Sequence, residues 1–132
     1  MRLVADSHAV VWYAKGSSSL SASAREALTG AETDGGIVVS VASLIDLWYV
    51  TLTTKGVTKD DLDRLRAGLL ASDSVSLQPV TIEIVDAYVG IDRGALGDPW
   101  DRLIVATAQA LELPLVTRDG QIRTAGLVET IW

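Results

Sequence analysis

The chain has 132 residues, a length typical of one domain, and 48% of them are hydrophobic. Its 17 acidic and 11 basic residues give a formal charge of -6, which argues against a broad basic surface for nucleic acid. The sequence contains no cysteine, which excludes disulfides and thiolate metal sites. No apolar run reaches the roughly 20 residues that span a bilayer. The first residues also lack a signal-peptide pattern, so we expect a single cytoplasmic domain over residues 1–132 without a membrane partner.

Short apolar runs alternate with helical patterns along the chain. The runs typical of strands are 2–5, 37–40, 74–80, 115–117 and, at the sheet edge, 127–131. The helical patterns are 8–14, a segment capped by Ser21 or Ser23 that breaks at 33–36, 41–55, 58–72, 81–92, and a segment from Pro99 to before Pro114. Such alternation predicts an α/β fold with a parallel sheet of four to five strands and helices on both faces.

Acidic residues occur where such a sheet binds ligands, beyond the carboxyl ends of its strands. Asp6 follows the first predicted strand and Asp119 the fourth. Asp101 begins a nearly all-apolar helix that returns to the fourth strand, so it lies at the same edge. Asp46 lies in the second turn of another apolar helix, where an unpartnered carboxylate would be costly.

Each of these acids has an ordinary alternative role, because Asp is common in helix caps and turns. Four like charges at one edge nevertheless repel and need a counter-ion. A hard cation such as Mg²⁺ or Mn²⁺ would supply it. Asp98 is different, because it precedes Pro99 with the pattern of a helix cap, and this structural role is sufficient for it. It is therefore only a secondary site candidate.

Three segments of the sequence resemble a known family: residues 3–12 (LVADSHAVVW), 98–108 (DPWDRLIVATA) and 115–119 (LVTRD). In order and spacing they are similar to PIN domains, and among these to the VapC-type toxins of type II toxin–antitoxin pairs. The resemblance implies a three-layer α/β/α fold and a Mg²⁺- or Mn²⁺-dependent endoribonuclease. It also implies a VapB-type antitoxin as partner, RNA as substrate, and a homodimer.

The resemblance maps the acidic residues of the family onto Asp6, Asp46, Asp101 and Asp119. Asp6, Asp101 and Asp119 would hold the metal, and a water molecule would hydrolyse the RNA phosphodiester. One position departs from the family. Its second acid is usually Glu in a Ser-x-x-Glu setting, whereas this chain has Ser43 followed three residues later by Asp46. The shorter side chain leaves a water-bridged role open beside direct ligation.

Several neighbours of these acids are candidates for secondary roles. The hydroxyls of Thr117 and Ser7 lie next to predicted ligands and are suited to holding water. Arg102, Arg118 and Lys55 are candidate phosphate contacts. The alternative for these basic residues is that they only balance local carboxylates.

The aromatic residues and the one histidine are expected mainly in structural positions. His8 is expected on a helix face, outside the chemistry. Trp12, Trp48 and Trp100 are expected mostly in the core, although such rings also line partner grooves.

Three other classes compete with the nuclease interpretation. A phosphatase of the haloacid dehalogenase type also has Asp after its first strand, but it needs a second Asp where this chain has His8. A phosphoacceptor receiver domain would have Lys after a later strand, where this chain has Arg118 and Asp119. A catalytically degenerate PIN domain would bind RNA or protein without cutting, and the Asp at position 46 keeps that alternative open.

Overall fold

The computed structural model describes residues 1–53 and 56–132. At its centre is a five-stranded sheet in the order β3-β2-β1-β4-β5, and every pairing is parallel. The strands are β1 (Leu3–Ala5), β2 (Ile37–Ser40), β3 (Val75–Gln78), β4 (Leu115–Val116) and β5 (Thr130–Ile131). The predicted parallel sheet is therefore confirmed, including its C-terminal edge strand.

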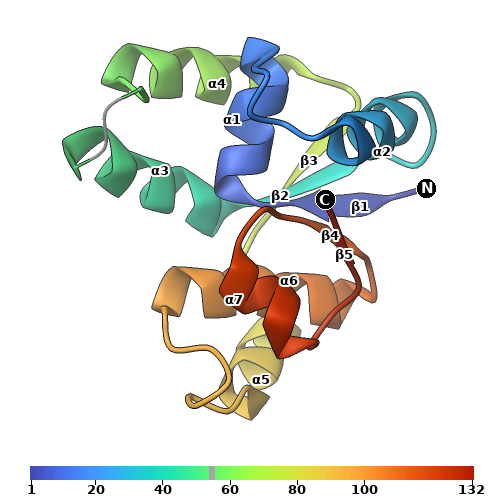
Figure 1. Ribbon diagram of the computed structural model, residues 1–132, viewed down its shortest axis with the longest axis vertical. Helices are drawn as coiled ribbons and strands as arrows, with labels where there is room; N and C mark the ends of the chain where they lie inside the picture. Colours follow the sequence, from blue (N-terminus) through green and yellow to red (C-terminus); the bar gives the residue numbers. More distant parts are fainter. Residues whose placement is uncertain (54–55) are drawn as a thin grey trace.

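Helices cover both faces of the sheet and form a three-layer α/β/α arrangement (Figure 1). One face carries α1 (Ser7–Lys15), α2 (Ala22–Thr33) and α4 (Lys59–Ala71). The other carries α5 (Ile82–Gly90), α6 (Pro99–Leu111) and α7 (Gly120–Ala125). The remaining helix, α3 (Val41–Thr53), starts directly after β2 and packs against α1, α4 and α6. No helix within the described ranges is both long and apolar enough to cross a bilayer.

The short strands are buried on both faces because their residues alternate between two cores. Leu3 and Ala5 belong to the core under α1, α2 and α4, whereas Val4 belongs to the core under α5 and α6. Strands covered on both sides need apolar residues at every position. This explains why they appear in the sequence as continuous apolar runs.

Side-chain caps define where most helices begin. Ser21, and not Ser23, caps α2, since its hydroxyl accepts a hydrogen bond from the Ala24 N–H. Thr58 caps α4 and Thr81 caps α5. The predicted end of α3 at Lys55 lies outside the described residues.

Candidate active site at the carboxyl edge of the sheet

In the described part of the chain, five carboxylates line one hollow of about 490 Å³ beyond the carboxyl ends of β1 and β4. The acidic lining residues are Asp6, Asp46, Asp98, Asp101 and Asp119. The structure therefore brings together all four acids that the sequence placed at this edge, and it adds the cap residue of α6. The same hollow is lined by His8, Trp12 and Arg118. We call it the acidic hollow.

Asp6 is held in place at the end of β1 by two short hydrogen bonds. Its Oδ1 accepts from the Ser7 N–H at 2.6 Å, and its Oδ2 accepts from the Thr117 hydroxyl at 2.6 Å. The Thr117 Oγ1 in turn accepts from the Asp119 N–H at 3.1 Å. Burial raises the pKa of Asp6, and the Thr117 and Ser7 hydrogen bonds partly oppose that rise. Thr117 thus links the ends of β1 and β4 and orients the Asp6 carboxylate.

Asp98 positions the first turn of α6. One carboxylate oxygen accepts from the backbone N–H groups of Trp100 and Asp101, at 2.9 and 3.1 Å. Pro99 occupies the first helical position, where its missing N–H costs nothing. This cap places Asp101 one turn into the helix, at the lining of the hollow.

The Asp101 carboxylate also has a raised pKa, and the neighbouring acids contribute to the rise. Burial, and then the charges of neighbouring acids, raise its pKa from 3.8 to about 7. Those neighbours are Asp98, Asp119, Asp6 and Asp46. All four carry the same charge, so the proton on Asp101 relieves a repulsion that a bound cation would also relieve.

The other two predicted acids reach the hollow from separate helices. Asp119 caps α7, with its Oδ1 accepting from the Ile122 N–H at 2.9 Å. Asp46 lies in α3, is partly exposed and lines the hollow. An apolar helix therefore carries this carboxylate without burying it.

Comparison with known proteins decides the family, because the model of the PIN domain matches residues 3–127. The chain belongs to the PIN domain family. No curated protein sequence matches the chain.

Solved structures show which folds this PIN domain resembles. VapBC2 from Rickettsia felis, bound to a DNA fragment from the promoter, aligns with a TM-score of 0.71 and 17% identity over 98% of this chain and 97% of that chain. A toxin–antitoxin complex from Klebsiella pneumoniae gives 0.64 and 18% over 96% and 94%. VapBC-5 from Mycobacterium tuberculosis gives 0.62 and 20% over 98% and 96%. At these identities the likeness shows a shared fold.

Two buried hydroxyls of the PIN domain accompany the acids. Ser7 and Ser43 are fully buried, and neither hydroxyl oxygen has a hydrogen-bond partner among the described residues. Ser7 directly follows Asp6, and Ser43 lies one turn before Asp46. Buried hydroxyls of this kind usually have a partner. Sequence analysis did not single out Ser43 as a site residue, although the Ser-x-x-Asp spacing marked its place.

Arg102 does not serve as a phosphate contact in the PIN domain, contrary to the sequence-based prediction. It is only 7% exposed. Its guanidinium donates to the carbonyl oxygens of Leu96, Tyr88 and Ile91 at 3.0, 3.2 and 2.9 Å, and it lies 4.8 Å from the centroid of the Tyr88 ring. Through these hydrogen bonds the Arg102 guanidinium holds the segment between α5 and α6 against α6. The side chain is therefore unavailable to RNA.

The other basic candidates have different positions. Arg118 is exposed at the hollow, with its guanidinium carbon 5.7 Å from the centroid of the Trp12 ring, and it stays a predicted phosphate contact. Lys55 lies outside the described residues. His8 lines the hollow beside Trp12, so it is closer to the acids than its helix-face pattern suggested.

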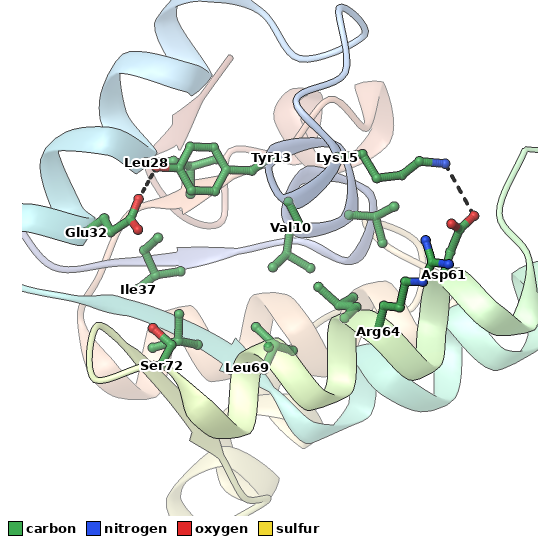
Figure 2. A pocket seen from close by; sticks show the side chains of 15 residues that line it. Val10, Tyr13, Lys15, Leu28, Glu32, Ile37, Asp61, Arg64, Leu69 and Ser72 are labelled. Atoms are coloured by element: carbon green, nitrogen blue, oxygen red, sulfur yellow. Dashed lines mark hydrogen bonds and ion pairs between the residues drawn. The ribbon is translucent and has the colours of Figure 1, made fainter.

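A second hollow of about 620 Å³ lies between α1, α2 and α4 (Figure 2). Its walls are largely apolar, and its acids are paired. Glu32 accepts a hydrogen bond from the Tyr13 hydroxyl, and Asp61 accepts one from Lys15 at 3.3 Å (Figure 2). Because its carboxylates already have partners, this apolar hollow lacks the unbalanced charge of the acidic hollow.

The donor chemistry of the acidic hollow fits a hard divalent cation, since carboxylate oxygens are the ligands that Mg²⁺ and Mn²⁺ prefer. Within residues 1–53 and 56–132, no group of three or more His, Cys, Asp or Glu side chains is already arranged to hold a metal ion. The acids line one common hollow. The fit therefore rests on the donor set and on the raised pKa of Asp101.

Proposed function

We propose that this PIN domain is a metal-dependent endoribonuclease that hydrolyses RNA phosphodiester bonds as the toxin of a toxin–antitoxin pair. The observation that carries the proposal is the gathering of Asp6, Asp46, Asp101 and Asp119 at one hollow, where burial, and then the charges of neighbouring acids, raise the pKa of Asp101 to about 7. Membership of the family supports nuclease activity, because PIN domains are generally nucleases. The fold likeness to VapBC structures supports the toxin role.

Asp6, Asp101 and Asp119 are the residues that would hold Mg²⁺ or Mn²⁺. When bound, such a cation lowers the pKa of a coordinated water and neutralises charge on the phosphate. Thr117 keeps Asp6 oriented through its hydroxyl, and Asp98 fixes the turn that presents Asp101. The protein thus supplies carboxylates whose positions are set by backbone and hydroxyl hydrogen bonds.

Three further groups act on water and phosphate in this proposal. Asp46 is the partly exposed acid, and it orients the attacking water or accepts its proton. The buried hydroxyl of Ser7 holds water beside Asp6. Arg118 contacts a phosphate of the substrate, because its exposed guanidinium lies at the same hollow.

The proposed partners are a VapB-type antitoxin and a second copy of the chain. A basic antitoxin side chain would balance the acids of the hollow and exclude the substrate. The homodimer is supported by an apolar stripe on α3, where Ile45, Trp48 and Leu52 are 49%, 45% and 63% exposed. The expectation that Trp48 lies in the core is wrong, because its side chain is exposed. We propose that the protein acts on RNA in the cytoplasm.

The test is to incubate the purified protein with total RNA, with and without Mg²⁺ or Mn²⁺, and to map the new ends by sequencing. We expect cleavage at defined sites that EDTA abolishes. Asp6→Asn should abolish cleavage while its circular dichroism spectrum stays unchanged. Asp46→Asn should lower the rate by about 10- to 100-fold if Asp46 acts through a water. Undiminished cleavage by Asp6→Asn would overturn the mechanism.

The competing function, a degenerate PIN domain that binds without cutting, is tested by the same samples. It is supported by the shorter acid at position 46. It predicts that the wild type binds RNA or antitoxin, cuts no RNA under any metal condition, and shows no rise in melting temperature with Mn²⁺.

A further inference from the structure

One wall of the acidic hollow is not acidic. His8, Trp12 and Arg118 line it, and we call these three residues the aromatic wall. The His8 and Trp12 rings lie one turn apart on α1, with centroids 5.4 Å apart and planes tilted by 47°. The Arg118 guanidinium carbon lies 5.7 Å from the centroid of the Trp12 ring, within cation–π distance. The wall is thus built around the Trp12 indole.

The position of Arg118 is unusual among so many acids. Five carboxylates line the same hollow, yet within the described residues Arg118 forms no ion pair with any of them. Its guanidinium lies over the indole instead. Its N–H donors are therefore not committed to a described carboxylate and can contact a phosphate.

The Trp12 ring is fixed from behind. It packs against Trp132, with centroids 5.9 Å apart, and against the core under α1, α2 and α4. It is only partly buried, and it contributes to the lining of the hollow. A ring that is anchored on one side and open to an active site on the other is pre-organised for stacking with a flat ligand.

The charge of the chain favours a contact to RNA that does not depend on net charge. A protein with a formal charge of -6 gains little from the general attraction to phosphates that drives most nucleic-acid binding. Arg102, near the start of α6, already donates hydrogen bonds to three backbone carbonyls and cannot contact RNA. Base stacking is independent of net charge and accepts any unpaired base.

We propose that Trp12 is the nucleobase-binding residue of this site. An unpaired base next to the cleaved phosphodiester stacks on its indole and displaces the Arg118 guanidinium, which then contacts the phosphate of that nucleotide, and His8 bounds the ring at its side. The inference rests on the proposed ribonuclease function and narrows its substrate to single-stranded RNA, because a base inside a duplex has no free face.

The test uses a short single-stranded oligoribonucleotide that carries the mapped cleavage site, and two versions that are abasic at one or the other nucleotide flanking it. For the wild type, removing the stacked base should lower kcat/KM by about 5- to 150-fold, the range for one base–aromatic stack. Trp12→Leu should cause a similar loss on the intact oligonucleotide and no further loss on the abasic one. Trp12→Phe should recover part of the activity.

The matched control is Tyr13→Leu, which removes the next ring on α1. Tyr13 lines the apolar hollow on the other side of that helix, so its loss should leave the effect of the abasic substitution unchanged. A duplex of the same sequence should be cut more slowly than the single strand.

Several results would overturn the assignment of Trp12. If Trp12→Leu loses the same factor on intact and abasic substrates, the ring acts only through the fold. If the wild type cleaves both abasic versions as fast as the intact one, no base is stacked, and the ribonuclease function still stands. If Trp12→Leu weakens antitoxin binding alone, the wall is a protein contact. If the wild type cuts no RNA with either metal, both proposals fail.

Discussion

The helices α4 and α6 begin with the same local arrangement and end in opposite electrostatic environments. Each has 13 residues, and each carries a polar cap, Thr58 or Asp98. Each also has an Asp at the third helical position, Asp61 or Asp101, where a carboxylate favours the positive end of the helix dipole. From local sequence alone the two acids would be assigned the same role.

Asp61 is a satisfied carboxylate. The Asp61 carboxylate accepts a hydrogen bond from the Thr58 N–H at 3.0 Å, and the Asp61 N–H donates to the Thr58 hydroxyl at 3.1 Å. This pair of hydrogen bonds is a capping box. Lys15 adds a hydrogen bond at 3.3 Å. The backbone hydrogen bond from Thr58, and then Lys15, lower the pKa of Asp61.

Asp101 is the opposite case. The Asp98 carboxylate already accepts from the N–H groups of the first turn, and within the described residues the Asp101 side chain forms no hydrogen bond of its own. Burial, and then the charges of neighbouring carboxylates, raise its pKa to about 7, and within the described residues Asp101 forms no ion pair. The contrast teaches that a first-turn acid is a cap when it pairs with a cation, and a candidate ligand when it is half-buried beside other acids and pairs with no cation.

The largest expected effect is a difference in RNA cleavage between substitutions of Asp101 and Asp61. Asp101→Asn should lower metal-dependent RNA cleavage by at least about 100-fold, since it removes a proposed ligand and not merely a supporting group. The matched Asp61→Asn should leave the rate near that of the wild type. The measurement is the single-turnover rate on the mapped oligonucleotide in Mn²⁺. Equal losses in the two variants would show that Asp101 has no special role.

A smaller effect concerns stability without metal. In EDTA, Asp101→Asn should raise the free energy of unfolding by about 1 kcal/mol, because it removes a repelled charge that solvent partly screens. Asp61→Asn should lower the urea midpoint, because it weakens the capping box and the contact with Lys15. Urea titrations at pH 8 measure both. A less stable Asp101→Asn protein would contradict the electrostatic account.

In EDTA, Asp101 and Asp61 should change the free energy of unfolding in opposite directions as the pH rises. Because the pKa of Asp101 is raised from 3.8 to about 7, the folded state binds the proton more tightly than the unfolded chain, so stability falls as pH rises between those values. Asp61 has a lowered pKa, so its contribution is present above its ordinary pKa and is lost as pH falls through the folded value. Asp101→Asn should flatten the fall in stability between about pH 4 and pH 7 that the wild type shows.

The smallest expected effect comes from a substitution that makes the cap of α6 similar to that of α4. Asp98→Ser replaces the carboxylate cap with a hydroxyl cap like Thr58, which keeps the capping hydrogen bond and removes one charge. We expect cleavage to change by less than about 5-fold and stability by less than about 1 kcal/mol, because Ser and Asp are similar caps. A loss as large as that of Asp101→Asn would show that Asp98 holds metal directly.

Much of the fold could be predicted because its signals are local. Strands buried on both faces appear as apolar runs, and the caps at Thr58, Thr81 and Asp98 mark helix starts. The meeting of Asp6 and Asp119 was also predictable, since parallel strands present their carboxyl ends at one edge. Their roles as metal ligands stay predictions.

The sequence by itself determined the order of strands and helices and the edge at which the acids gather, because periodicity, caps and strand ends are properties of neighbouring residues. Only the tertiary structure decided which charges find partners. It directed Arg102 to three carbonyls, Arg118 to the Trp12 ring and Lys15 to Asp61, and it left Asp101 among like charges. Pairing depends on distances between segments far apart in the chain, and a carboxylate takes its pKa from those distances.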